Sequence, residues 1–166
     1  MERWDNRVKE DHETLESQMS ALKEALAIEG ETLDRQMILR RFVRVIGPDL
    51  ELHLRKEEEV LFPALLKLSS EKEESIAFLK QQHGELRLAL RRLAGLLCEC
   101  DCASGKMDWK VVAEAGQQFI ELLEDHERKE DRLLIHVLEE GLNSQELMKL
   151  AQGFQKVAWA TYREAL

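Results

Sequence analysis

Hydrophobic residues recur every three or four positions along almost the whole chain, the spacing that places them on one face of an α-helix. Glycine, proline and serine interrupt this pattern and divide it into helical segments. We expect helices over residues 4–28, 31–68, 71–99, 107–141 and 143–165. Within the second segment, Gly47 and Pro48 predict a kink or a short break, because proline cannot donate the backbone hydrogen bond. The pattern therefore predicts an all-α protein.

The order and length of these segments favour an antiparallel up-and-down four-helix bundle with an additional C-terminal helix, since short connections make consecutive helices antiparallel neighbours. We assign residues 1–142 to the bundle and residues 143–166 to the last helix. Asn143 and Glu146 have the spacing of a capping box at its start. Its apolar face consists of Leu147, Leu150, Phe154, Val157 and Trp159. That face most simply packs on the side of the bundle, and association into a homodimer is the alternative.

Composition narrows the classes of partner and location. The formal net charge of −9 argues against DNA or RNA, because phosphate binding favours a basic surface. No stretch approaches about 18 uninterrupted apolar residues, the length that a membrane-spanning helix needs. The charged N-terminus lacks the apolar segment of a signal peptide. We therefore expect a cytoplasmic protein without a nucleic-acid or membrane partner.

Histidine and glutamate occupy several positions of the apolar helix faces where the pattern predicts leucine. These residues are His12, His53, Glu57, His83, His126 and Glu130. A buried imidazole or carboxylate loses hydration, and a hydrogen bond, a charge partner or a metal ion must compensate. A single histidine of this kind is more often a satisfied core residue than a ligand. Together, the six residues point to a metal site.

The two halves of the chain repeat this arrangement. HLRKEEEVLFPAL at residues 53–65 aligns with HERKEDRLLIHVL at residues 126–138, an offset of 73 residues, and the two single histidines repeat with an offset of 71. At ~1.5 Å per helical residue, the distances of the four histidines from the predicted turns place them at nearly the same height along the bundle. The largest mismatch, ~7 Å, is small enough for a kink and helix tilt to absorb. We therefore expect the six side chains to converge.

Six such residues suit two metal ions, because one ion usually takes three or four protein ligands. Each H-x-x-x-E motif places its histidine and glutamate on one helix face, about one turn apart. Mixed nitrogen and oxygen donors favour two iron ions, with manganese or zinc as competitors. If both glutamates bridge the irons and each iron takes two histidines, an oxo- or hydroxo-bridged pair keeps an open position. O2, nitric oxide or peroxide could bind there.

The ordered set H … H-x-x-x-E … H … H-x-x-x-E, together with HLRKEEEVLFPAL, resembles the hemerythrin-like, or HHE cation-binding, family over about residues 8–140. The resemblance implies a four-helix bundle and a non-haem di-iron centre with the same six residues as ligands. Oxygen-carrying hemerythrins have a fifth histidine one turn from the third-helix histidine. Leu79 and Arg87 stand four positions either side of His83, so the resemblance does not extend to reversible oxygen carriage.

The spacing within this family gives a finer resemblance. The histidines are separated by 41, 30 and 43 residues, which is closer to bacterial di-iron proteins of iron–sulfur cluster repair and nitric-oxide stress. Oxygen carriers use an aspartate five residues after the last histidine, and Asp131 stands there. Helix geometry favours Glu130 instead, because four residues turn through ~400° and return almost to the same face. Glu58, beside Glu57, is expected to be solvated or to support a ligand.

These observations predict a metal-binding protein whose centre binds or reacts with O2, peroxide or nitric oxide, in iron handling or in oxidative or nitrosative stress. The alternative is an oxygen or iron sensor without catalytic turnover, and a purely structural bundle is the third interpretation. No general base and no substrate pocket can be identified from the sequence, so the sequence does not distinguish an enzyme from a sensor.

Three cysteines, Cys98, Cys100 and Cys102, form a second group of chemically active side chains. An odd number at adjacent positions is not typical of a disulfide framework. Cys98 stands fifteen residues after His83, more than about 20 Å along a helix, so we expect no shared centre. Ordinary reduced cysteines are the simplest interpretation. A soft-metal site, a redox switch and an intermolecular disulfide are the alternatives.

Overall fold

The computed structural model describes residues 4–28, 30, 32–102, 108–140 and 142–164. Its α-helices are α1 (Trp4–Ala27), α2 (Leu33–Lys56), α3 (Phe62–Leu68), α4 (Glu73–Cys102), α5 (Trp109–Glu140) and α6 (Ser144–Glu164). A turn of π-helix, η1 (Glu57–Leu61), joins α2 to α3, and a short 3-10 turn, η2 (Ser70–Lys72), precedes α4. These residues include no strand. The predicted all-α class is confirmed.

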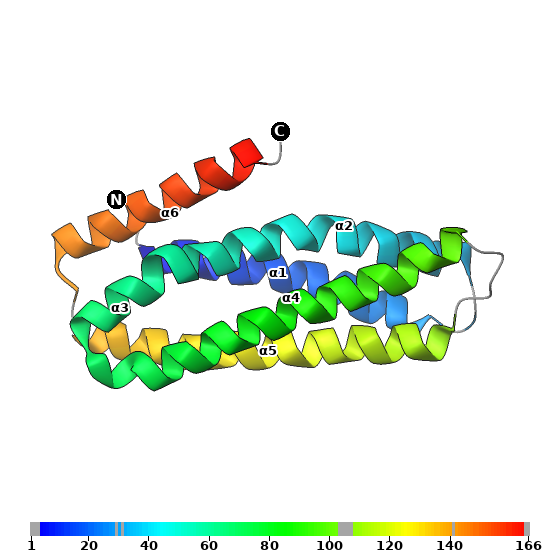
Figure 1. Ribbon diagram of the computed structural model, residues 1–166, viewed down its shortest axis with the longest axis horizontal. Coiled ribbons are helices and arrows are strands. Elements are labelled where there is room, and N and C mark those ends of the chain that lie inside the picture. Colours follow the sequence, from blue (N-terminus) through cyan, green and yellow to red (C-terminus); the bar gives the residue numbers. More distant parts are fainter. Residues whose placement is uncertain (1–3, 29, 31, 103–107, 141, 165–166) are drawn as a thin grey trace.

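The long helices lie side by side (Figure 1). α4 packs against α5 and α1 against α2, while further contacts join α2 to α4 and α1 to α5. α6 lies on the outside of this group, against α2, η1 and α1. Within the part of the chain that the structure describes, none of the helices combines the length and apolar character needed to cross a bilayer.

The second long segment is irregular, but at a different place from the one predicted. α2 continues through Gly47 and Pro48, so the predicted break there does not occur. Pro48 and Arg44, the residue four positions earlier, are both exposed, so water can satisfy the carbonyl that proline leaves unpaired. The irregular turn is η1, where the backbone N–H of Phe62 donates to the carbonyl of Glu57. Such single π-turns are frequent at functional sites.

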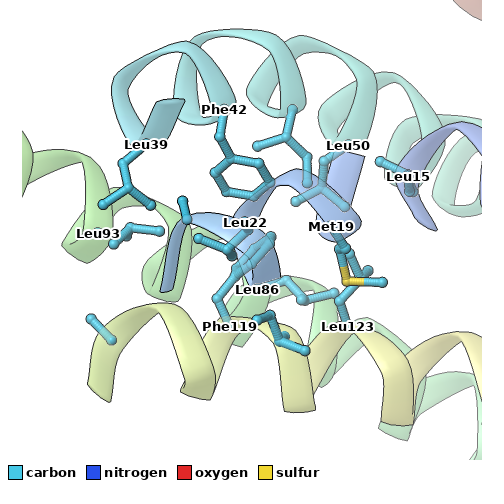
Figure 2. Close-up of a cluster of buried hydrophobic side chains, with 14 of the residues drawn as sticks. Leu15, Met19, Leu22, Leu39, Phe42, Leu50, Leu86, Leu93, Phe119 and Leu123 are labelled. Atoms are coloured by element: carbon cyan, nitrogen blue, oxygen red, sulfur yellow. The ribbon is translucent and has the colours of Figure 1, made fainter. Parts of the chain in front are cut away.

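Two apolar clusters of described residues flank the level of the predicted site. The first apolar cluster fills one half of the molecule and includes Leu15, Met19, Leu22, Phe42, Leu86 and Phe119 (Figure 2). The second apolar cluster includes Val8, Leu61, Phe62, Leu65, Ile76, Leu79, Leu133 and Phe154. On α4, for example, His83 stands between Leu79 of the second cluster and Leu86 of the first. The polar level is therefore closed at both ends by tightly packed side chains.

α6 contributes to this core, with one departure from the predicted face. Leu150 and Phe154 belong to the second apolar cluster, so both side chains are buried against other helices. Trp159, near the end of α6, is 58% exposed, so this part of the predicted face does not pack on the bundle. The division of the chain at residue 142 stays a prediction.

Candidate metal centre

The predicted site residues come from four different stretches of the chain and meet in the interior. They are His12 on α1, His53 on α2, Glu57 at the start of η1, His83 on α4, and His126 and Glu130 on α5. Five of the six residues are at most 2% exposed. The side chain of His12 is 12% exposed and is the one that solvent reaches.

The atoms that could bind a metal form two groups among the described residues, with the atoms of each group within 4.8 Å of one another. The first donor group consists of His12, His53, Glu57 and Glu130. In it, Glu130 Oε2 lies 2.9 Å from His12 Nε2 and 3.8 Å from His53 Nε2. Glu57 Oε1 lies 2.7 Å from His53 Nε2. Two imidazoles thus face two carboxylates.

The second donor group consists of Glu57, His83 and His126. Glu57 Oε2 lies 3.0 Å from His83 Nε2 and 3.7 Å from His126 Nε2. Glu57 therefore belongs to both groups and turns one carboxylate oxygen toward each. Glu130 belongs to the first donor group alone.

Hydrogen bonding does not account for this cluster. Both carboxylate oxygens of Glu57, and the Nε2 atoms of His53 and His83, are buried without a hydrogen-bond partner of good geometry in the described part of the chain. The same holds for both ring nitrogens of His126 and for Glu130 Oε1. Leaving a buried polar atom unpaired costs ~1–3 kcal/mol, and more for a charged group. A cation between these atoms would satisfy them together, so the residues fit a metal centre.

Electrostatics centre on the charge of Glu57. Burial alone would raise the pKa of the Glu57 carboxyl, but the imidazoles of His53, His126 and His83 hold that pKa well below its ordinary value. Burial opposes protonation of His53, yet the charge of Glu57 raises the pKa of His53 well above its usual range. At Glu130, burial and the negative charge of Glu57 raise the pKa of the carboxyl. Of the two buried glutamates, Glu57 is therefore the one whose surroundings favour the charged carboxylate.

A second layer of charged residues contacts the histidines from behind. Glu58 Oε1 lies 2.7 Å from His83 Nδ1, and Arg87 donates a hydrogen bond of 2.9 Å to the same oxygen. Asp11 lies 3.8 Å from His53 Nδ1 and accepts a 2.6 Å hydrogen bond from Lys56. A carboxylate behind a metal-binding histidine fixes the orientation and tautomer of the ring.

Sequence reasoning missed most of this layer. The sequence predicts that Glu58 is either solvated or supports a ligand. It indicates nothing of Arg87 beyond the absence of a histidine at that position. Asp11 and Lys56 lie in charged runs that carry no periodic signal. The i, i+4 spacing of His83 and Arg87 on one helix face was the available clue.

The remaining candidates lie outside the two donor groups. Asp131 is 59% exposed, and its carboxylate lies 3.6 Å from His12 Nδ1. The other ring nitrogen of His12, Nε2, faces Glu130. Cys98 is exposed and belongs to neither group. The side chains of Cys100 and Cys102 lie outside the described residues. The expectation that Cys98 stands apart from the centre agrees with this placement.

Comparison with known proteins adds one finding. The family model described as Hemerythrin HHE cation binding domain matches residues 5–101, more than half of the chain. The matched span contains His12, His53, Glu57 and His83, and the α5 residues follow it. Searches of curated proteins and of solved structures gave no match.

Proposed function

The chain belongs to the hemerythrin HHE cation-binding domain family, and on this premise we propose that it is a non-haem di-iron protein whose centre binds or reacts with O2, peroxide or nitric oxide. The family supports metal binding, typically of iron. The number of metal ions, their identity and their reactant belong to the proposal, with manganese and zinc as competitors. The proposal also includes a closer relation of this chain to bacterial proteins of iron–sulfur repair and nitric-oxide stress, and a role in iron handling or stress.

One observation carries the proposal of two metal ions. Glu57 directs its two oxygens to separate sets of imidazole nitrogens, and both oxygens are buried without a hydrogen-bond partner in the described chain. A carboxylate placed in this way suits a bridge between two cations. The proposed ligands are His12, His53, Glu57, His83, His126 and Glu130.

The chain's own residues would prepare the site in three ways. The imidazoles and carboxylates would hold the metal ions, which would supply Lewis acidity and one-electron redox chemistry. The two apolar clusters exclude water above and below the site and lower the local dielectric constant. His12, 12% exposed, marks the side from which a small molecule enters.

The finer architecture belongs to the same proposal. We take the four long helical stretches as an antiparallel up-and-down bundle and residues 143–166 as an added helix that covers its side. Buried Leu150, Phe154 and Val157 support the covering role, and a homodimer through the apolar face of α6 is the alternative. The net charge of −9 supports a protein without a nucleic-acid partner, and we propose a cytoplasmic location.

Metal analysis tests this proposal directly. Protein purified in air without chelators should contain about two irons per chain, and less than about one metal per chain would refute it. His53→Ala should lose iron and lower the melting temperature, because metal-binding energy is partly folding energy. Glu59→Ala is the matched control, since Glu59 lies in the same turn with its carboxylate exposed and paired with Arg55. Retention of both irons in His53→Ala would show that the proposed ligands are wrong.

A specific contact favours sensing as the second candidate function. α6 packs on η1 so closely that a Cβ atom at Gly153 would lie 2.6 Å from Val60 Cγ1. Glu57 and Val60 both belong to η1. Gain or loss of metal at Glu57 would therefore move η1 and change its packing against α6. Turnover of excess peroxide or nitric oxide would favour the enzyme. A stoichiometric spectral change, with altered hydrogen exchange in α6, would favour the sensor.

A further inference from the structure

We propose that Glu58 and Arg87 act together as a positioning pair for His83 and thereby set the metal affinity of the second donor group. This inference rests on the proposed metal centre and adds to it two residues outside the ligand set. It also predicts that the pair acts mainly on one of the two metal positions.

The contact between Glu58 and His83 defines which nitrogen the ring offers. His83 is fully buried, and its Nδ1 lies 2.7 Å from Glu58 Oε1. An imidazole that donates its Nδ1 proton to a carboxylate presents an unprotonated Nε2 on the other side. That Nε2 lies 3.0 Å from Glu57 Oε2, within the second donor group. Glu58 thus orients the lone pair of His83 toward the proposed metal.

Arg87 holds Glu58 in place. Its Nη1 donates to Glu58 Oε1 over 2.9 Å, while its Nε and Nη2 donate to Glu51 over 2.8 and 3.1 Å. The guanidinium group is therefore fixed between two carboxylates from the neighbouring helical stretch, as its planar fork allows. Arg87 therefore fixes the Glu58 carboxylate in the position from which it contacts His83.

The π-turn explains why two adjacent glutamates both face inward. Its i→i+5 bonds place more residues in each turn than an α-helix does, so adjacent side chains are separated by a smaller angle. Glu57 is buried at the centre, and Glu58, 31% exposed, reaches His83 from the side. Glu59 follows at 47% exposed and pairs with Arg55 instead. Three consecutive residues of the turn thus have different roles: Glu57 is a proposed ligand, Glu58 positions His83, and Glu59 faces solvent. Glu59 is therefore a suitable control position.

His83 is distinct among the four imidazoles in having this short contact. The Nδ1 atoms of His53 and His12 lie 3.8 and 3.6 Å from the nearest carboxylate oxygens on their outer side. The Nδ1 of His126 has no hydrogen-bond partner in the described part of the chain. The second donor group also has three members against four in the first. Loss of the pair should therefore weaken the second position much more than the first.

Chelator competition on iron-loaded protein measures this selectivity. Glu58→Ala should weaken one of the two metal positions by about 10–100-fold and leave the other nearly unchanged, as expected for loss of an outer-layer partner. Glu58→Gln keeps an oxygen acceptor for Nδ1 and should fall between Glu58→Ala and wild type. Arg87→Met should weaken the same position. Glu59→Ala should match wild type.

A second readout separates failure of this inference from failure of the proposed function. Long-range 1H–15N NMR of the metal-free protein reports which nitrogen of His83 carries the proton, whether or not metal binds. Wild type and Glu59→Ala should show a protonated Nδ1, and Glu58→Ala should shift both nitrogen signals of His83. If wild type binds no metal, the proposed function fails and the spectra alone decide whether Glu58 positions His83. Unchanged metal affinity in Glu58→Ala, unchanged His83 signals, or an equal effect of Glu59→Ala would overturn the inference.

Discussion

Replacing Gly153 with alanine tests how tightly α6 packs on the π-turn next to the proposed centre. A Cβ atom at this position would lie 2.6 Å from Val60 Cγ1, 3.1 Å from Cγ2 and 3.4 Å from Cβ. Favourable carbon–carbon contacts are ~3.5–4.0 Å, so the first two contacts are too short. Val60 is branched at Cβ and stiff about χ1, and it belongs to η1. Either α6 or the π-turn must therefore move.

Two opposed effects set the magnitude. Alanine stabilises a helix interior by ~1 kcal/mol relative to glycine, whereas extra atoms in a well-packed contact cost ~1–3 kcal/mol. Their difference predicts that Gly153→Ala destabilises the protein by about 0–2 kcal/mol. A protein of this size loses about 2–4 °C in melting temperature for each kcal/mol. The predicted fall is thus measurable by calorimetry.

Gly95→Ala is the matched control for this change. Gly95 lies within α4, and a Cβ atom there would meet nothing within 4 Å. Urea denaturation should therefore show Gly95→Ala stabilised by up to ~1 kcal/mol.

Removing the opposing side chain tests the same contact from the other side. In a Val60→Ala background, Gly153→Ala should change sign and become stabilising, because the obstructing methyl groups are gone. Close packing of α6 on Val60 is refuted if Gly153→Ala stabilises wild type as much as Gly95→Ala does. The same conclusion follows if Val60→Ala does not reverse the sign of the effect of Gly153→Ala.

Four other substitutions test separate parts of the structure. Glu57→Ala should remove metal from both positions, whereas His12→Ala should weaken one position alone; equal loss in the two variants, by metal count, would contradict the shared role of Glu57. Phe119→Ala should cost ~3–5 kcal/mol in urea denaturation, because its fully buried ring contacts Phe42 edge to face, and a cost below about 1 kcal/mol would contradict that packing. Cys98→Ser should leave the metal content unchanged, since Cys98 is exposed and outside both donor groups, and a loss of metal would argue for a thiolate ligand.

Local signals predicted the helices and their ends well. The capping box of α6 is confirmed: Asn143 Oδ1 accepts from the backbone N–H of Glu146, and Glu146 Oε2 accepts from the N–H of Asn143. Such a cap depends on residues three apart, so sequence alone specifies it. The π-turn depends instead on packing between distant elements. Its side chains contact α6 and line the buried site, and hydrophobic periodicity carries no sign of it.

The pattern also predicted which side chains turn inward at the site, but not how they divide. The internal repeat suggests that Glu57 and Glu130 are equivalent, since each stands four residues after a histidine. The structure places Glu57 in both donor groups and Glu130 in one. Glu130 lies in the regular helix α5, whereas Glu57 begins the π-turn. Backbone geometry that the repeat does not encode therefore separates two residues with the same sequence context.

The same geometry gives aligned neighbours different roles. Glu58 and Asp131 occupy corresponding positions of the repeat, 73 residues apart. In the π-turn Glu58 stays close to the inward face and contacts His83 at 2.7 Å. On the regular helix Asp131 turns outward, is 59% exposed and lies 3.6 Å from His12. The donor group with fewer members thus has the closer carboxylate contact behind its histidine. If the repeated sequence holds two metal ions, as proposed, the two positions should differ in affinity and in their response to mutation.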